Sequence, residues 1–331
     1  METTSEKRGR ILSGMRPTGP LHIGNLVGAL KNWVALQDEC DCFYMIADWH
    51  ALMSEYHNAR TIKQATYEVV ADWLGAGLDP DRSCLFRQSD VAGHAELHLI
   101  LSCITPIGWL ERCPTYKEQL KELQAKEVNT YAFLGYPTLQ AADILIYRAD
   151  LVPVGDDQLP HLEITREIAR RFNNLVGPVF PEPQPKLTRS ARLLGLDRRK
   201  MSKSYGNAIY LSDAPDVLAE KVMNMITDPQ RARRTDPGRP DYCNVHSYYE
   251  VFAPEMADEV AEKCRAAAFG CRDCKKALAE RLGDLLAPIR ARREAAIADT
   301  AKLDALLAAG ADRARSEADH TMQRVHDALG F

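Results

Sequence analysis

Short apolar runs and helical apolar stripes alternate along the first half of this 331-residue chain. Apolar residues recur at helical spacing over 26–36 and again over 62–73. Four apolar runs separate or flank these stripes and predict buried strands, at residues 11–12, 43–47, 84–86 and 151–154. Such regular alternation predicts a Rossmann-like α/β fold with a doubly wound parallel sheet.

The rest of the chain has a helical pattern. Residues from about 92 to 135 form a mainly helical insertion between two predicted strands. After residue 211 the pattern is helical throughout, with apolar residues recurring at Leu278, Leu282, Leu285 and Ile289. We therefore expect a sheet domain over 1–211 and an α-helical domain over 212–331, whose final helix can pack back onto the first.

Composition is that of an ordinary soluble globular protein, with 46% hydrophobic and 27% charged residues. The net charge is −4, so any contact with nucleic acid requires local basic patches, such as those at 189–203, 231–239 and 272–276. The first ten residues are polar and no apolar run is long enough for a bilayer, so we expect neither a signal peptide nor a membrane contact. Nine cysteines, an odd number, favour a reducing cytoplasm over a disulfide framework.

The first chemical signal is a glycine-rich turn after the first predicted strand. Gly14, Gly19 and Gly24 allow the backbone to approach a ligand closely, and Gly24-Asn25 stand where a helix begins. Open N–H groups at a helix start are suited to phosphate. His22, directly before them, adds a side chain that can be charged or neutral.

The second signal is Lys200-Met-Ser-Lys-Ser204, a segment with two lysines and two hydroxyls. It is suited to a loop that closes over a polyphosphate, although such a pentad taken alone is more often a solvated loop. His22-Ile-Gly-Asn25 and this pentad, in this order, resemble the two signatures of class I aminoacyl-tRNA synthetases.

The segments 136–147 and 152–166 narrow the resemblance. Tyr-Pro-Thr-Leu-Gln-Ala-Ala-Asp143, followed by Val-Pro-Val-Gly-Asp-Asp-Gln158, is similar to the tryptophanyl-tRNA synthetase family, and the resemblance covers essentially the whole chain. It implies that Asp143 accepts the indole N–H of tryptophan, and that Tyr136, Gln140 and Gln158 lie beside it. A carboxylate in an apolar helix needs a donor, and indole offers one N–H and no acceptor. Without the resemblance, pairing with an arginine or capping of a helix would explain Asp143 better.

The resemblance also implies an ATP site and a reaction. Tryptophan attacks the α-phosphorus of ATP, with Mg²⁺ on the pyrophosphate, and the activated amino acid then passes to tRNA(Trp). The catalytic residues it implies are His22, Lys200 and Lys203. The residues it implies for ATP binding are Arg16, Pro17, Thr18, Gly24, Asn25, Gly155, Asp156, Asp157, Leu193, Lys200, Met201, Ser202, Lys203 and Ser204. Arg16 departs from the glutamine common in the family.

Two rival functions stay open. Tyr136, Gln140 and Asp143 also match a pattern that tyrosyl-tRNA synthetases use around tyrosine, and Gln140 stands where many tryptophanyl enzymes have methionine. The other rival is a non-catalytic paralogue that binds RNA or a partner protein. Intact signatures argue against the paralogue, and the segment 141–158 favours tryptophan.

Four cysteines in the helical half follow the spacing C-x20-C-x6-C-x2-C, namely Cys243, Cys264, Cys271 and Cys274. Four thiolates at such spacing are suited to zinc or to an iron–sulfur cluster. Some tryptophanyl-tRNA synthetases carry a 4Fe–4S cluster on a similar pattern whose first spacer is two residues longer, and we therefore expect the cluster here. Because the first spacer is shorter in this chain, Cys243 is the ligand that departs from the family's pattern. The other five cysteines read as core residues. The resemblance further implies a homodimer and an anticodon-binding role for 212–331.

Overall fold

The computed structural model describes residues 9–114, 116–117, 130–155, 158–187 and 193–331. Its centre is a five-stranded sheet in the order β3-β2-β1-β4-β5, and every strand pairing is parallel. The predicted Rossmann-like fold is thereby confirmed. The strands are β1 (Arg10–Met15), β2 (Asp41–Ile46), β3 (Cys84–Arg87), β4 (Leu151–Val154) and β5 (Gln184–Leu187).

The strands are apolar because helices cover both faces of the sheet, as a parallel sheet requires. β1 lies at the centre and is in full register with β2, from Arg10 opposite Asp41 to Met15 opposite Ile46. Gly14 is needed there, since a Cβ at this position would lie 2.9 Å from the Met45 carbonyl oxygen. The carboxyl ends of β1, β2 and β4 therefore meet at one edge, where open α/β sheets bind ligands.

The helices of the first half connect these strands. The stripe that follows Gly24 is not one regular helix, because a π-helical turn over Leu26–Leu30 separates α1 from α2. Such turns are frequent at functional sites. The α-helices are α1 (Ile23–Asn25), α2 (Lys31–Glu39), α3 (Asp48–Glu55), α4 (Arg60–Ala76), α5 (Gly93–Ser102), α6 (Ile107–Glu111), α8 (Tyr131–Ile146) and α9 (Leu159–Leu175).

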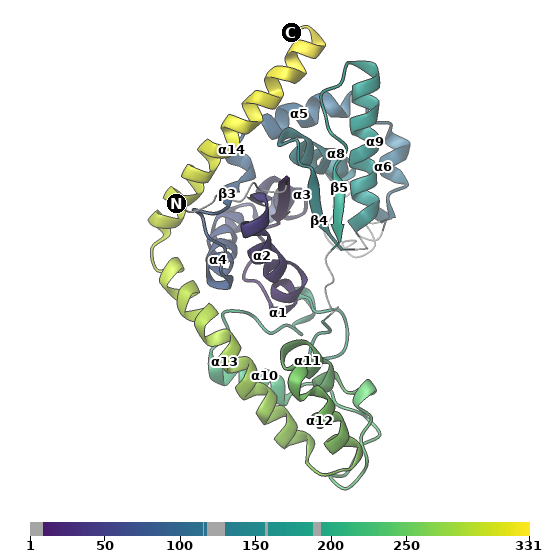
Figure 1. Cartoon of the computed structure of the whole chain (residues 1–331), viewed down its shortest axis with the longest axis vertical. Coiled ribbons are helices and arrows are strands. Elements are labelled where there is room, and N and C mark those ends of the chain that lie inside the picture. The colour runs from purple at the N-terminus through teal and green to yellow at the C-terminus, as the bar shows by residue number, and fades with distance from the viewer. Residues whose placement is uncertain (1–8, 115, 118–129, 156–157, 188–192) are drawn as a thin grey trace.

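The second half forms a helical lobe and two long helices (Figure 1). α13 runs from the lobe along α4, and α14 continues along the same side of the molecule to β3. The contact with β3 is so close that a Cβ at Gly310 would lie 1.9 Å from the Leu85 carbonyl oxygen. The final helix thus packs on the sheet, whereas the boundary near 211 remains a prediction. The helices are α10 (Pro215–Met223), α11 (Asn244–Phe252), α12 (Pro254–Arg265), α13 (Cys271–Ile297) and α14 (Thr300–Leu329).

Each face of the sheet has its own aromatic core. On the α2–α4 side, Trp33 stacks on Tyr44 with ring centroids 4.5 Å apart, and Trp73 meets Trp33 edge-on. On the α14 side, Phe43 stacks on Tyr147 at 5.0 Å. These rings bury large apolar area in fixed geometry and so hold the sheet rigid beneath the ligand edge.

The surface contains one departure from expectation. Cys40, Cys42, Cys84 and Cys113 are buried as predicted, but Cys103 is exposed near the end of α5, so its prediction as a core residue is wrong.

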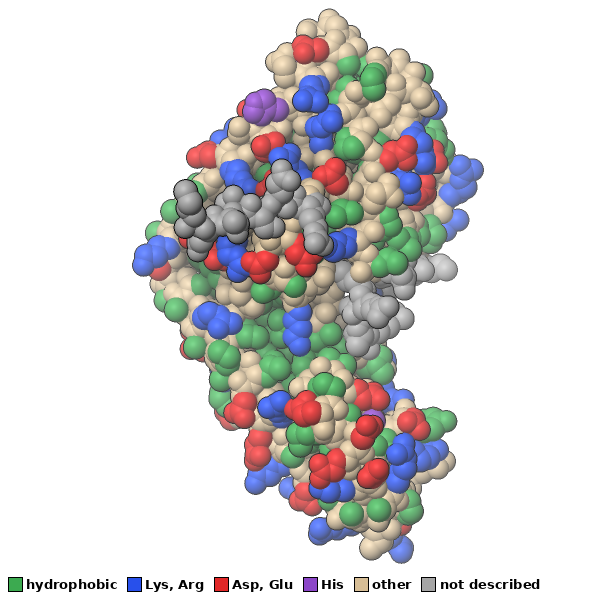
Figure 2. Space-filling model, viewed as in Figure 1, with side chains coloured by type: hydrophobic (Ala, Val, Ile, Leu, Met, Phe, Trp, Pro, Cys, Tyr) green, Lys and Arg blue, Asp and Glu red, His purple; other side chains and the backbone are tan. Residues whose placement is uncertain are grey.

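Figure 2 shows hydrophobic side chains at the narrow region above the helical lobe, and acidic and basic side chains mixed over the lobe itself. In the described residues, no helix combines the length and apolar character that a bilayer crossing requires.

Candidate active site

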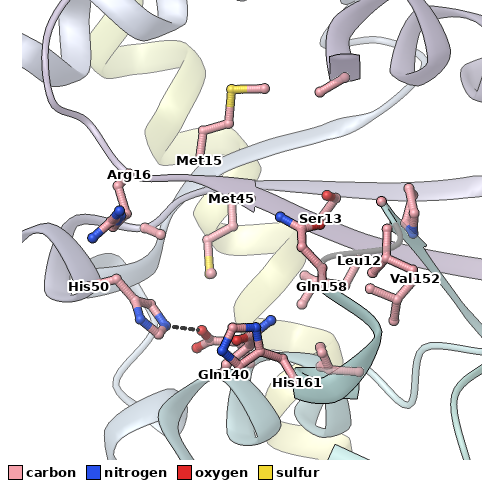
Figure 3. Close-up of a pocket in the computed structure, with 18 of the residues that line it drawn as sticks. Leu12, Ser13, Met15, Arg16, Met45, His50, Gln140, Val152, Gln158 and His161 are labelled. Carbon is pink, nitrogen blue, oxygen red and sulfur yellow. Dashed lines mark hydrogen bonds and ion pairs between the residues drawn. The ribbon is translucent and has the colours of Figure 1, made fainter. Parts of the chain in front are cut away.

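A cavity of about 570 Å³ opens at the carboxyl edge of the sheet (Figure 3). β1, β4, α3 and α8 supply most of its walls, which include Ser13, His50 and Val152. It brings together nine predicted site residues that are distant in sequence: Arg16, Gly24, Asn25, Tyr136, Gln140, Asp143, Gly155, Gln158 and Lys200.

Asp143 is the most tightly held group of the cavity. Its side chain on α8 is 2% exposed. One oxygen, Oδ1, accepts from Gln88 Nε2 and His94 Nδ1, both at 2.7 Å, and Oδ2 accepts from His50 Nε2 at 2.8 Å. The dashed line in Figure 3 marks the bond from His50. A carboxylate has about four acceptor sites, so three donors leave room for one more at the cavity.

The charge state of Asp143 follows from these contacts. Burial alone would raise the pKa of Asp143, but the hydrogen bonds from His50 and His94 outweigh it and lower the pKa below its ordinary value. An ionised carboxylate only accepts, so each histidine nitrogen that faces it carries the proton. His94 Nε2 is in turn paired with the Tyr147 hydroxyl at 2.7 Å. The partners of Asp143 are thus two histidines and a glutamine amide, rather than the arginine or helix end considered as the alternative.

Sequence reasoning identified only part of this group. Asp143 was predicted, whereas His50, which follows β2, was not, and neither were Gln88 and His94. Both follow β3, whose carboxyl end lies beside that of β2. Polar residues after an adjacent parallel strand were the signal that could have indicated them.

Tyr136, Gln140 and Gln158 surround the cavity near Asp143. The Tyr136 hydroxyl is paired with His161 Nε2 at 2.6 Å. Burial, followed by the charge of Cys113, raises the pKa of Tyr136. The Tyr136 ring therefore forms a neutral wall whose hydroxyl is already engaged.

His22 caps α1 directly before Gly24 and Asn25, which line the cavity. Its Nδ1 accepts the Asn25 N–H at 3.2 Å, and the Asn25 side chain accepts the His22 N–H at 3.0 Å. Burial, together with the charge of Lys203, lowers the pKa of His22 to about 4. The ring is therefore neutral near pH 7, with its proton on Nε2. In this conformation the Asn25 N–H is occupied by the cap and is not open for phosphate.

Backbone pairing brings the lysine pentad to the same turn. Ile23 donates to the Ile209 carbonyl and Leu211 donates to the Leu21 carbonyl, both at 2.9 Å. Lys203 Nζ then reaches the Gly19 carbonyl oxygen at 2.7 Å. Lys203 also contacts Thr18 Oγ1 at 3.4 Å, and a Cβ at Gly24 would lie 3.5 Å from the Met201 sulfur.

Among the described residues, six others predicted for nucleotide binding do not line the cavity: Pro17, Thr18, Leu193, Met201, Ser202 and Lys203. Leu193 and Met201 are buried in the core beside the turn. Ser202 donates its N–H to Asn207 Oδ1 at 2.9 Å, which shapes the pentad. Asp156, Asp157 and the side chain of Ser204 are outside the described part of the structure.

Comparison with known proteins decides the family. A sequence model described as tRNA synthetases class I (W and Y) matches residues 4–287. The chain belongs to this family. It is therefore an aminoacyl-tRNA synthetase, and residues of both signatures, Gly24, Asn25 and Lys200, line the cavity.

Full-length relatives agree with this assignment. The tryptophan–tRNA ligase of Thermotoga maritima is 50% identical over 325 residues, covering 97% of this synthetase and 99% of that protein. That of Aquifex aeolicus is 42% identical, covering 97% and 100%. The tryptophanyl-tRNA synthetase of Campylobacter jejuni, solved with ADP and tryptophan, is 33% identical with a TM-score of 0.88, covering 97% and 100%.

The four spaced cysteines of this synthetase are partly buried free thiols: Cys243 precedes α11, Cys264 lies near the end of α12, and Cys271 and Cys274 lie in the first turn of α13. Burial raises the pKa of Cys274 to about 12, and the charges of Cys243, Cys264 and Cys271 act in the same direction, so the four sulfurs are within electrostatic range of one another. Within the described residues, no three His, Cys, Asp or Glu side chains are arranged to hold one metal ion.

Proposed function

We propose that this protein is a tryptophan–tRNA ligase. The observation that carries the proposal is Asp143, an ionised buried carboxylate with three protein donors and room for a fourth at the cavity. Indole supplies a single N–H and no acceptor, and its flat apolar surface fits the ring of Tyr136. The resemblance to named tryptophan–tRNA ligases over the whole chain supports the same substrate.

The first step is formation of tryptophanyl-adenylate. A carboxylate oxygen of tryptophan attacks the α-phosphorus of ATP, and the bond to the bridging oxygen breaks as pyrophosphate leaves with the electron pair. No protein nucleophile is needed, so the residues act by positioning and by stabilising charge on the phosphates. His22 meets the phosphates through Nε2–H, and Lys200 and Lys203 approach from the pentad. When bound with ATP, Mg²⁺ would supply positive charge to the pyrophosphate.

The nucleotide is held between the first turn and the pentad. We assign its adenosine and phosphates to the predicted set that includes Arg16, Thr18, Gly24, Gly155 and the pentad. The Arg16 side chain is exposed and lines the cavity, so its guanidinium is available to a phosphate.

The second step transfers tryptophan to tRNA(Trp). A ribose hydroxyl of the terminal adenosine attacks the activated carbonyl, and AMP leaves. We assign the anticodon to the helical lobe, where Arg233, Arg234, Arg272 and Lys276 are exposed and offer local positive charge. Arg231 of the predicted basic patch is buried and does not contribute to this surface. The mixture of charges on the lobe in Figure 2 fits local contacts better than a uniformly basic surface.

ATP–pyrophosphate exchange tests the proposal. Exchange should depend on tryptophan and should be absent with tyrosine at the same concentration. Exchange with tyrosine instead would identify the alternative substrate, which the pattern of Tyr136, Gln140 and Asp143 also fits. Exchange with neither amino acid would indicate the non-catalytic paralogue.

We also propose a 4Fe–4S cluster on Cys243, Cys264, Cys271 and Cys274, with zinc as the alternative. The chemistry of the donor set fits: four thiols lie within electrostatic range, and Arg231 Nη1 contacts Cys264 Sγ at 3.6 Å. When bound, such a group cross-links the elements that carry the four cysteines.

Anaerobic purification tests the cluster. The wild-type protein should be brown, absorb near roughly 400 nm and hold about four irons per chain, and Cys271→Ser should lose the colour. Colourless wild-type protein that contains one zinc would overturn the iron–sulfur assignment.

The nine free thiols fit a reducing compartment, and on that ground we propose the cytoplasm.

A homodimer is proposed from the helical insertion. Leu99, Ile107 and Tyr131 on α5, α6 and α8 are 66%, 63% and 76% exposed. Large exposed apolar side chains mark interaction surfaces, and a second copy of this chain is the partner that the family resemblance implies. Light scattering should give twice the chain mass, and Ile107→Lys should shift the protein toward monomer.

A further inference from the structure

A buried ion pair joins α13 to the turn that carries His22. Arg293, near the end of α13, donates from Nε to Asp72 Oδ1 at 2.8 Å. The other oxygen of Asp72, on α4, accepts the N–H of Leu21 at 2.6 Å. Asp72 is fully buried, Arg293 is 8% exposed, and Arg293 also contacts Glu68. Arg293, in the helical half, is thus linked through the Asp72 carboxylate to the backbone next to His22.

The contact is with the residue directly before His22. Asp72 holds the Leu21 N–H, and the Leu21 carbonyl accepts from Leu211. Both backbone groups of Leu21 are therefore paired, which fixes the direction in which the chain enters α1. A buried N–H needs an acceptor, and a buried carboxylate needs a cation. Arg293 supplies the cation that the Asp72 carboxylate needs, and Asp72 supplies the acceptor that the Leu21 N–H needs.

The same carboxylates reach the pentad electrostatically. Burial lowers the pKa of Lys203 to about 8, and the negative charges of Asp72 and Glu68 oppose this shift. The carboxylates thus act on Lys203 through their charge, and Asp72 acts on the His22 turn through its hydrogen bond with the Leu21 N–H.

We propose that Arg293 and Asp72 are positioning residues for adenylate formation: through Leu21 they hold the His22 turn where it faces Lys203, which makes α13 part of the active-site scaffold. This inference rests on the proposed reaction. Because Arg293 and Asp72 share no hydrogen-bond partner with Asp143, their loss should affect the nucleotide end and leave tryptophan binding intact.

The chain offers a matched control in Arg292. Its Nε and Nη2 donate to the Gly75 carbonyl oxygen at 2.9 and 2.6 Å, so it also joins α13 to α4 without touching Asp72. Arg293→Met and Arg292→Met should be compared in tryptophan-dependent ATP–pyrophosphate exchange, with melting temperatures measured in parallel. We expect Arg293→Met to lower kcat about tenfold or more, with KM for tryptophan unchanged. Arg292→Met should leave kcat unchanged.

A double-mutant cycle isolates the pair. Asp72→Asn keeps an oxygen that can accept the Leu21 N–H, and it removes the charge that Arg293 compensates. The double variant Asp72→Asn/Arg293→Met should be no slower than Arg293→Met, because no unpaired buried charge remains. Arg293→Lys keeps a cation beside Asp72 and should recover most of the lost kcat; this variant also serves if the Met variant does not fold.

Three results would overturn the inference: equal kcat in the Arg292 and Arg293 variants, an Arg293→Met defect confined to KM for tryptophan, or multiplying losses in the double variant. These results require an active wild-type protein. A wild-type protein without tryptophan-dependent exchange would instead overturn the proposed function, so the two failures are distinguishable.

Discussion

The two ends of the cavity are held in different ways. At the amino-acid end, Asp143 is buried and already accepts three hydrogen bonds from protein side chains. At the nucleotide end, Lys203 contacts neutral oxygens of Gly19 and Thr18, and His22 is an uncharged cap. The first end is preorganised for one donor, whereas the second holds a cation on weak partners that a polyphosphate can replace.

This difference predicts which kinetic constant each end controls. Substitutions around Asp143 should affect substrate recognition and stability, because that network exists before the substrate binds. Substitutions at the pentad should affect kcat, because its cations gain their strong partner only with the reacting phosphates.

The largest effect is expected from Lys203→Ala. It removes a cation from the developing phosphate charge and should lower the rate of adenylate formation about 10²- to 10³-fold, while tryptophan binding changes little. Single-turnover adenylate formation and equilibrium tryptophan binding measure the two quantities. Lys186→Ala, which removes a surface pair with Glu39, is the control. Equal losses of rate and binding would contradict the assignment.

Asp143→Asn should come next, with a loss of about 10- to 100-fold in kcat/KM for tryptophan. The amide weakens the acceptor for indole and disturbs its histidine donors. A tryptophan analogue with sulfur in place of the indole N–H cannot use that acceptor. For this analogue, kcat/KM of the variant should therefore be almost the same as that of the wild type. An equal fall in kcat/KM for tryptophan and for the analogue would mean that Asp143 is structural.

A smaller effect, on stability, is expected from His94→Leu. The change removes one donor from Asp143 and leaves the Tyr147 hydroxyl unpaired, which should lower the free energy of unfolding by about 1–3 kcal/mol. Tyr147→Phe removes only the outer hydrogen bond and should cost less. Urea unfolding of both variants ranks them, and the reverse order would exclude this account of the network.

The smallest effect concerns pH. The pKa of His22 is about 4 in the folded chain and 6.5 for the free side chain, so the unfolded state takes up the proton first. This group therefore costs stability as the pH falls from about 7 toward 4. His22→Gln should lose less stability than the wild type between pH 7.5 and pH 5.0 in urea titrations. Identical slopes would mean that His22 does not remain neutral.

Much of the fold and part of the site could be predicted from the chain alone. The alternation of strands and helices, the His22 turn at a helix start, and Asp143 as a carboxylate in an apolar helix all depend on neighbours in sequence. Local periodicity, turn chemistry and burial are sufficient for such features. The π-helical turn over Leu26–Leu30 and the exposure of Cys103 were missed because packing decides them.

The sequence by itself determined the parallel sheet, the two signatures and the family to which they belong. Only the tertiary structure decided which side chains meet at Asp143, that α14 returns to β3, and that Arg293 pairs with Asp72, 221 positions away. The spacing of apolar residues along the chain determines which secondary structure a segment forms. Contacts between distant segments arise when the sheet and long helices bury their apolar faces against one another, and no local pattern records that choice.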